Sequence, residues 1–150
     1  MQHKWLYAGV LAALAALVLF SLGGGFWGGE ATARHWTHNL FYGICHQIPE
    51  RSFHLNEIPM AVNSRCFGIF AGLFAAWAAI PLFTRRLSGN PWPARILLVA
   101  VMLQILDYSG NVMQLWENTN SSRFVLGFIL GAPASLTAGT LFSTNNHNGK

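Results

Sequence analysis

The stretch FGIFAGLFAAWAAIPLF, residues 67–83, carries no charged side chain and consists of aliphatic, aromatic and small residues. A run of this kind is close to the ~20 apolar residues that cross the hydrocarbon core of a bilayer as a helix. Gly68, Gly72 and Ala76 recur at every fourth position, so they share one helical face that is almost bare backbone. Helices in lipid associate by close approach at such small residues, so this face predicts a tight contact with a second helix.

Three further apolar runs extend this pattern along the chain, over residues 5–22, 92–113 and 123–142. Of the 150 residues, 53% are hydrophobic and 9% are charged, against about 25% charged residues in soluble domains. We therefore expect one all-α membrane domain, residues 1–150, with four transmembrane helices and an extracytoplasmic loop, helical or irregular, over residues 23–66. The first run could instead belong to a signal peptide cleaved near residues 31–33, but that site lies well beyond the run, which favours an uncleaved span.

The last run repeats the small-residue pattern of the second. Its small residues, again four apart, are Gly127, Gly131, Ser135 and Gly139. We expect this face to meet either the small face of the second span or the alanines of the first.

Charged residues divide between the two sides of the predicted membrane. Lys4, Arg85, Arg86, Arg95 and Lys150 fall on one side, and Glu30, Glu50, Glu57 and Glu117 fall on the other. Because Lys and Arg are enriched in cytoplasmic segments, both termini of this multi-pass protein of the cell membrane should be cytoplasmic. The formal net charge of +4 reflects this asymmetry, and no basic run indicates a nucleic-acid partner.

Polar residues line one stripe of the third predicted span and the segment after it. They are Gln104, Asp107, Asn111, Gln114 and Asn118, spaced three or four apart. An acid facing lipid costs several kcal/mol, so the stripe should face the protein interior, as a polar cavity or as interhelical hydrogen bonds. An Arg65–Asp107 or an Arg123–Asp107 ion pair is the first expectation.

The long first loop should contain one short helix within residues 31–45. Trp36, Leu40 and Ile44 recur every four residues there, as in a helix that lies in the headgroup layer. Residues 46–59 should be irregular, because Pro49 and Pro59 interrupt them.

The two cysteines of the chain, Cys45 and Cys66, allow three readings. With His46 they could ligate zinc or a similar divalent metal, although no Cys-x-x-Cys pair is present. On an oxidising side of the membrane they could form a disulfide that stabilises the protein by roughly 3 kcal/mol. Alternatively, Cys45 could be the catalytic nucleophile of an enzyme, with His46 or Asp107 assisting.

A further candidate is a ligand-binding notch at the same end of the bundle. Arginine forks match phosphate and carboxylate groups, so the notch could take an anion or a lipid headgroup. Its candidate residues are Arg51, Ser52, Arg65, Asp107, Asn111, Gln114, Asn120 and Arg123.

Four segments carry a family resemblance: CHQIPERSF (45–53), NSRCFGIFAG (63–72), DYSGNVMQ (107–114) and NTNSSRFVLGFILG (118–131). With them, the chain resembles the small bacterial membrane proteins of domain of unknown function 2085. The resemblance implies a polytopic membrane protein with no established activity, cofactor or substrate. In that family's Cys-x-Arg-Cys motif the first cysteine is Asn63 here, so a zinc site of three cysteines and one histidine would lack a ligand.

We expect a non-catalytic accessory subunit that lies in the lipid bilayer beside partner membrane proteins. Its polar Cys/His/Arg/Asp notch would bind a small ligand or metal at the extracytoplasmic face. The alternative is a small membrane enzyme that acts on a lipid headgroup or a thiol at the outer leaflet.

Overall fold

The computed structural model describes residues 4–28, 35–87 and 91–144, of which residues 83–87 and 141–144 are described by their backbone alone. Four helices are long and apolar enough to cross a membrane, which confirms the expected fold class. They are α1 (Lys4–Ser21), α4 (Ser64–Leu87), α5 (Trp92–Val112) and α6 (Asn120–Thr144). Helices α4 and α6 extend beyond both predicted ends of their spans, so the loop before α4 is shorter than residues 23–66.

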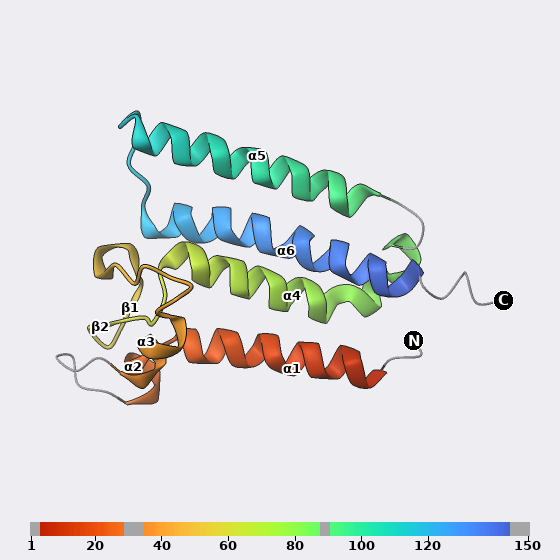
Figure 1. Cartoon of the computed structure of the whole chain (residues 1–150), viewed down its shortest axis with the longest axis horizontal. Helices are drawn as coiled ribbons and strands as arrows, with labels where there is room; N and C mark the ends of the chain where they lie inside the picture. Colours follow the sequence, from red (N-terminus) through yellow and green to blue (C-terminus); the bar gives the residue numbers. More distant parts are fainter. Residues whose placement is uncertain (1–3, 29–34, 88–90, 145–150) are drawn as a thin grey trace.

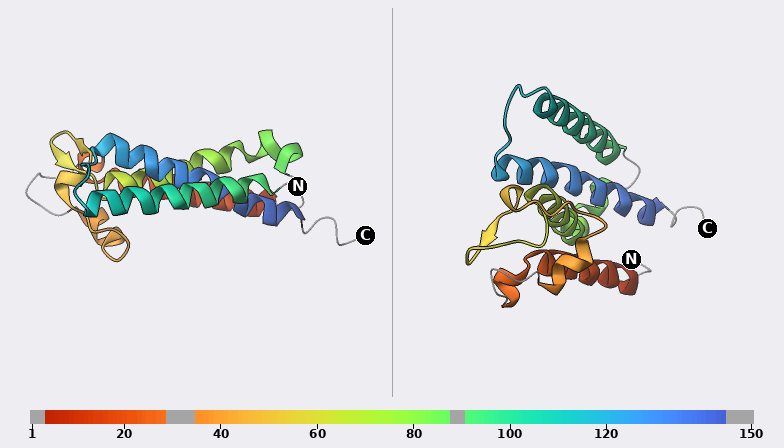
Figure 2. Two further views of the ribbon diagram at one scale, coloured as in Figure 1. Left: turned by 90° about the horizontal axis from the view of Figure 1, so that it is seen from above. Right: turned by 60° about the vertical axis from the view of Figure 1, so that its left-hand side comes forward.

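The four helices lie side by side in the order α1, α4, α6, α5 (Figure 1). Seen from above, they form a single layer (Figure 2). Helix α4 packs along α6 most extensively, while α1 contacts α4 and α5 packs mainly along α6. The ends of α1 and α6 nearest the termini lie together, opposite the end that carries the long loop (Figure 1).

The small faces of α4 and α6 meet each other, so the first of the two expected partners is correct. A Cβ on Gly72 would lie 2.6 Å from the Phe128 carbonyl oxygen, and one on Gly68 would overlap the carbonyl of Phe124. From the other side, a Cβ on Gly127 would overlap the carbonyl of Arg65. The two backbones touch because these positions carry no side chain.

Helix α1 is joined to α4 by an aromatic pair instead. The Tyr7 hydroxyl donates to the Trp77 carbonyl at 3.2 Å, and Trp77 Nε1 donates to the Tyr7 carbonyl at 3.2 Å. The two rings stack with their centroids 6.0 Å apart. This pair satisfies two polar side-chain groups that lipid could not.

The loop end, defined here as residues 22–63 with residues 113–119, is more regular than expected. It holds α2 (Gly24–Trp27), α3 (Trp36–Phe41), a 3₁₀ turn η1 (Pro49–Arg51) and a hairpin of β1 (His54–Leu55) and β2 (Ile58–Pro59). Of the helix expected within residues 31–45, residues 31–34 lie outside the described residues and the described part holds α3, while a hairpin replaces part of the predicted irregular segment. Asn56 and Glu57 both have positive φ, as a two-residue type I′ turn requires.

The prediction of one helical stripe is wrong beyond Asn111, because α5 ends at Val112. Gln114 has φ 55°, its N–H donates to the Asn111 carbonyl, and the Leu115 N–H donates to the Gly110 carbonyl. These two bonds form a Schellman motif, which ends a helix at a left-handed residue. A Cβ on Gly110 would overlap the Trp116 ring, so the chain folds back tightly here.

Candidate functional site

The segment 45–53 is docked onto the bundle by side chains that bind backbone groups. Gln47 Nε2 donates to the carbonyls of His38 at 2.6 Å and Ala61 at 3.0 Å. Asn63 Oδ1 accepts from the Ile48 N–H at 2.8 Å. The polar residues of this stretch therefore satisfy buried backbone groups that would otherwise cost several kcal/mol.

Residues at the starts of α4 and α6 form a second set of hydrogen bonds to the backbone of the loop. Ser64 Oγ, in the first turn of α4, donates to the Arg51 carbonyl at 2.9 Å, and Asn120 Nδ2, at the start of α6, donates to the Ser52 carbonyl at 3.0 Å. The Ser52 hydroxyl is buried and donates to the Ile48 carbonyl at 3.0 Å. Ser52 and Asn120, both expected to bind a ligand, thus hold the loop in place.

Asp107 lies at the loop end of α5 and is only 9% exposed. It forms an ion pair with Arg65 of α4, which is one of the two expected pairings. Asn118 Nδ2 also contacts both carboxylate oxygens of Asp107, at 2.8 and 2.7 Å. The acid of the third span therefore faces the protein, and it connects α5 to α4 and to the returning chain.

Two further arginines lie around this pair, and together with it they form the arginine notch: Arg51, Arg65, Arg123 and Asp107. Arg123 lies within electrostatic range of Arg51, Arg65, Asp107 and Glu117. Its guanidinium Nη1 donates to Asn120 Oδ1 at 3.4 Å. Among the described side chains, the ion pair of Arg65 with Asp107 is the only one, so Arg51 and Arg123 have no carboxylate partner there.

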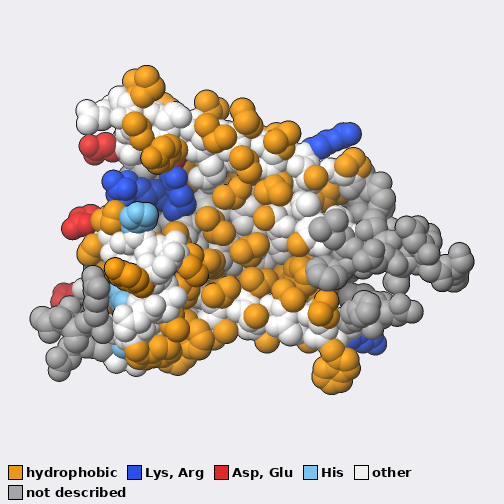
Figure 3. Space-filling view, viewed as in Figure 1, with side chains coloured by type: hydrophobic (Ala, Val, Ile, Leu, Met, Phe, Trp, Pro, Cys, Tyr) orange, Lys and Arg blue, Asp and Glu red, His pale blue; other side chains and the backbone are white. Residues whose placement is uncertain are grey.

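Figure 3 shows how charge is distributed over the molecule. Lys and Arg side chains gather at the loop end, beside a broad apolar band, and acidic side chains lie further out. All described acids, Glu50, Glu57, Asp107 and Glu117, belong to this end of the molecule, whereas Lys4 and Arg95 lie on the opposite end. Lys150 and Glu30 fall outside the described residues, as do the side chains of Arg85 and Arg86.

The cysteine pair forms a separate centre at the head of α4. Cys45 is 6% exposed, and its sulfur accepts the Asn63 N–H at 3.2 Å. The pKa of Cys45 is lowered to about 6, most strongly by the neighbouring Cys66 thiol. The N–H groups of Asn63 and Gln47 and nearby His46 also lower it, whereas burial raises it. These neighbours favour the thiolate of Cys45.

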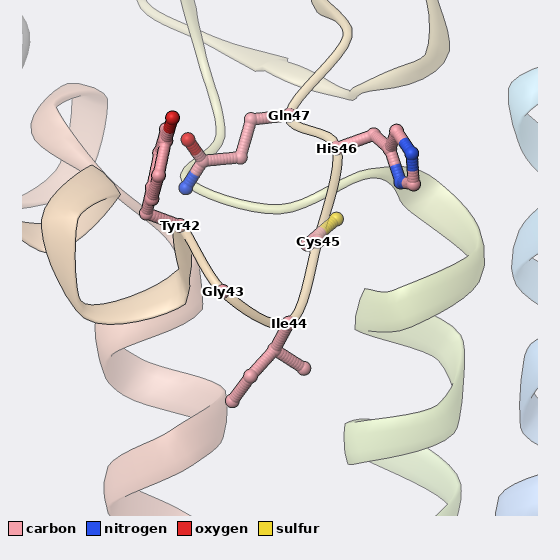
Figure 4. A pocket seen from close by; sticks show the side chains of 6 residues that line it. All are labelled: Tyr42, Gly43, Ile44, Cys45, His46 and Gln47. Atoms are coloured by element: carbon pink, nitrogen blue, oxygen red, sulfur yellow. The ribbon is translucent and has the colours of Figure 1, made fainter.

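A pocket of about 300 Å³ adjoins this pair and is lined by Tyr42, Gly43, Ile44, Cys45, His46 and Gln47. In Figure 4 the sulfur of Cys45 points toward the first turn of α4. The His46 ring lies on the α4 side of the pocket, and Tyr42 and Gln47 lie on the α1 side (Figure 4). The pocket is therefore next to the thiolate and apart from the arginine notch.

The side chains predicted to form a metal site, a disulfide or an enzyme site are only partly brought together by the fold. No cluster of three or more His, Cys, Asp or Glu side chains able to hold a metal exists among the described residues, so the expected set of Cys45, His46 and Cys66 has no such support. Cys45 and Cys66 are both free thiols. Asp107, the assistant expected in the enzyme reading, is held by Arg65 and Asn118.

Other expected ligand residues lie at the edge of the site. Asn111 Nδ2 donates to the Trp116 carbonyl at 3.4 Å, and Gln114 is exposed at the end of α5. Asn118 was part of the predicted stripe but not of the predicted notch, although its amide contacts both carboxylate oxygens of Asp107. It reaches Asp107 because the chain turns back after α5, and nothing in the spacing indicated this or the docking roles of Gln47 and Asn63.

Four apolar helices with a buried ion pair and a polar loop at one end define a polytopic membrane protein. The chain belongs to the family described as predicted membrane protein (DUF2085), whose family model matches residues 45–137. The matched segment begins at Cys45 and contains the arginine notch and the cysteine pair, but not α1.

Two relatives are uncharacterized proteins of archaea. One, from Methanocaldococcus jannaschii, is 37% identical over 89 residues, which is 59% of this chain and 56% of that relative. The other, from Methanothermobacter thermautotrophicus, is 31% identical over 107 residues, covering 71% of this chain and 91% of the relative. The chain thus spans little more than half the length of the first relative. No solved structure matches it.

Proposed function

We propose that this protein is a non-catalytic membrane component that binds an anionic phosphate or carboxylate group in its arginine notch. One observation carries this proposal: Arg123 lies within electrostatic range of both Arg51 and Arg65, and the buried carboxylate near it, that of Asp107, is already shared by Arg65 and Asn118. Two guanidinium groups are thus left to bind an anion, and their planar forks suit the oxygens of phosphate or carboxylate.

Electrostatics supplies the driving force for binding. At an effective dielectric constant of about 20, two like charges a few ångströms apart repel by roughly 2–4 kcal/mol. Arg123 experiences such fields from Arg51 and Arg65, and Asp107 and Glu117 offset them in part. An anion between the guanidinium groups would remove the remaining repulsion, which gives the notch its selectivity for negative charge.

The same chemistry fits a free anion or the phosphate of a lipid. The cationic patch borders the apolar band, at the level where lipid headgroups would lie (Figure 3). We orient the loop end to the extracytoplasmic side, because Lys4 and Arg95 lie at the opposite end without a described acid beside them. Both termini would then be cytoplasmic.

The test measures the thermal unfolding midpoint, Tm, of the full chain in detergent with increasing inorganic phosphate. Arg51→Gln replaces an exposed side chain. It should raise at least tenfold the phosphate concentration that gives half of the maximal rise in Tm, and Arg123→Gln should do the same. Arg95→Gln, at the other end, is the matched control and should respond as the wild type does. An equal response of Arg51→Gln and Arg95→Gln would contradict the proposal.

A second arm distinguishes the two sources of the anion. The wild type is placed in nanodiscs of phosphatidylglycerol or of phosphatidylcholine, and Tm is compared. Stabilisation by phosphatidylglycerol without any by free phosphate assigns the notch to a lipid headgroup. Stabilisation by free phosphate in phosphatidylcholine assigns it to a soluble anion.

We further propose that the protein is an accessory subunit, which means that it binds partner proteins in the membrane. Helix α5 is attached mainly along α6 and leaves apolar side chains such as Leu98, Leu106 and Tyr108 exposed, a surface that suits lipid and a second membrane protein alike. Purification in mild detergent tests the partner role by co-purifying chains, and a monomer without a companion chain would contradict it.

A further inference from the structure

We propose that Cys45 and Cys66 form a redox-active dithiol that exchanges with a small disulfide bound in the pocket of residues 42–47. This activity uses side chains other than those of the anion notch, although Arg65 of the notch lies within electrostatic range of Cys66. The inference rests on three features of the head of α4: two thiols in contact, backbone donors aimed at one of them, and a pocket beside that same one.

The first feature is the contact between the two thiols. Cys45 comes from the loop and Cys66 from the first turn of α4, and each thiol lies within electrostatic range of the other. Cys66 also packs against the buried cluster that contains Cys45, Phe41 and Val62. A disulfide could therefore form between side chains that already pack in one cluster, without rearrangement of the bundle.

The second feature separates the roles of the two cysteines. The Cys45 sulfur accepts the Asn63 N–H at 3.2 Å, and this donor stabilises a thiolate more than a thiol. The Gln47 backbone and Cys66 also lower the pKa of Cys45. Thiolates are the nucleophiles of disulfide exchange, so Cys45 is the attacking group and Cys66 is the resolving group.

The third feature is access for a substrate. Cys45 lines the pocket of about 300 Å³, at the lower end of the volumes that bind small molecules. Tyr42 and Ile44 are 73% and 69% exposed at its rim, so a low-molecular-weight disulfide can enter without a movement of the helices. This volume favours a small disulfide over a folded protein as the co-reactant.

The exchange balances in two steps. The Cys45 thiolate attacks one sulfur of the substrate disulfide, whose S–S bond breaks, and the departing thiolate takes a proton from water. Cys66 then loses its proton to water and attacks the Cys45 sulfur, which breaks the mixed disulfide and releases the second substrate thiolate, protonated in turn. The protein is oxidised from two thiols to one disulfide, and the substrate disulfide is reduced to two thiols.

A permanent structural disulfide is the competing account, and the loop does not need one. Gln47, Asn63, Ser64 and Asn120 already hold this segment to α4, α6 and the rest of the loop by hydrogen bonds. The competing account also gives no reason for a thiolate beside a pocket. The two accounts differ in reversibility, since an exchanging pair must be reduced again by a small thiol.

The experiment treats the full chain in detergent with oxidised glutathione and measures intact mass. We expect the wild type to lose two hydrogens without a lasting adduct, and to regain them in reduced glutathione. Cys66→Ser should keep one glutathionyl group on Cys45. Cys45→Ser should react at least tenfold more slowly than Cys66→Ser, because the remaining thiol lacks the donors that favour its thiolate.

A measurement on the unmodified chain guards against variants that fail to fold. Brief alkylation with iodoacetamide, followed by peptide mapping, should label Cys45 at least tenfold faster than Cys66 at pH 7. Because its pKa is lowered to about 6, the Cys45 rate should be half-maximal near that pH and constant above it. Equal labelling of the two cysteines, an oxidised pair that reduced glutathione cannot reduce, or no adduct on a folded Cys66→Ser would each overturn the proposal.

Discussion

Helix α6 contacts its two neighbours in different ways. Toward α4 the contact is backbone against backbone, because Gly68 and Gly72 face α6 and Gly127 and Gly131 face α4. Toward α5 the contact is looser, with a bond from Gln104 Nε2 to the Leu126 carbonyl at 2.7 Å, and the ion pair of Asp107 attaches α5 to α4 instead of to α6.

The difference follows from the interactions that stabilise helix association in a bilayer. Lipid is as apolar as leucine, so close packing and hydrogen bonds, rather than burial of apolar surface, hold helices together there. Helices α4 and α6 use close packing along most of their length, and α5 depends on a few hydrogen bonds near its loop end. We therefore expect α4 and α6 to be the rigid part of the molecule and α5 to be the part that detaches first.

The largest effect should come from a side chain placed in the α4–α6 contact. In Gly68→Leu the new atoms would overlap the carbonyl of Phe124, which is backbone and cannot turn away. The free energy of unfolding should fall by more than about 4 kcal/mol, the exceptional range that overpacking of this kind can reach. Unfolding in mixed micelles with increasing SDS, followed by tryptophan fluorescence, measures the change.

Gly9→Leu is the matched control for this prediction. Gly9 lies in α1, where a Cβ would meet nothing within 4 Å. Leucine favours a helix over glycine by up to about 1 kcal/mol, so this variant should unfold at the same or a higher SDS fraction. If both glycine variants lost the same stability, the contact between α4 and α6 would not be the rigid part of the protein.

The next largest effect should come from Asp107→Ala, which acts on the α5 side. Arg65 would lose its carboxylate and Asn118 would lose its acceptor, at a cost of about 3 kcal/mol, the low end for breaking a buried pair, since Arg65 can still reach water. The same substitution in an Arg65→Met background should cost at least about 1 kcal/mol less, because contacting residues couple. Equal costs in the two backgrounds would mean that the pair does not hold α5.

The contrast between the two contacts also marks what the sequence could predict. The glycines of α4 and α6 are spaced as helical neighbours, so periodicity alone indicated the close contact. For Asp107, the cost of an acid in lipid limited the partners to Arg65 or Arg123. Local spacing carries such information wherever a helix continues unbroken.

Prediction failed where distant residues decide the local conformation. The end of α5 depends on the Trp116 ring lying against Gly110 and on the left-handed Gln114, neither of which a helical pattern shows. Likewise, the side-chain amides of Gln47 and Asn63 bind backbone groups of other segments, which no local pattern indicated. Such roles depend on tertiary contacts, which one sequence does not reveal.

A smaller difference in stability is expected between variants of two asparagines of the predicted stripe. Asn118→Ala removes a donor to the charged Asp107 and should cost about 1.5 kcal/mol, as hydrogen bonds to charged groups do. Asn111→Ala is the control, because its amide reaches the Trp116 carbonyl at only 3.4 Å and is exposed there, so it should cost about 0.5 kcal/mol. Equal losses in SDS unfolding would show that the return of the chain to Asp107 does not help to fix α5.

The smallest effect should come from Gln104→Leu, further along α5. The carbonyl of Leu126 that Gln104 binds lies within α6, where it also accepts a bond from its own helix, so the substitution leaves no buried group unpaired. Leucine also suits the apolar contact that remains. The loss should be about 0.6 kcal/mol, the average for interhelical hydrogen bonds in membranes. A loss above about 2 kcal/mol in the same SDS assay would place the main attachment of α5 at this bond instead of at Asp107, and the comparison between the two sides of α6 would have to be redrawn.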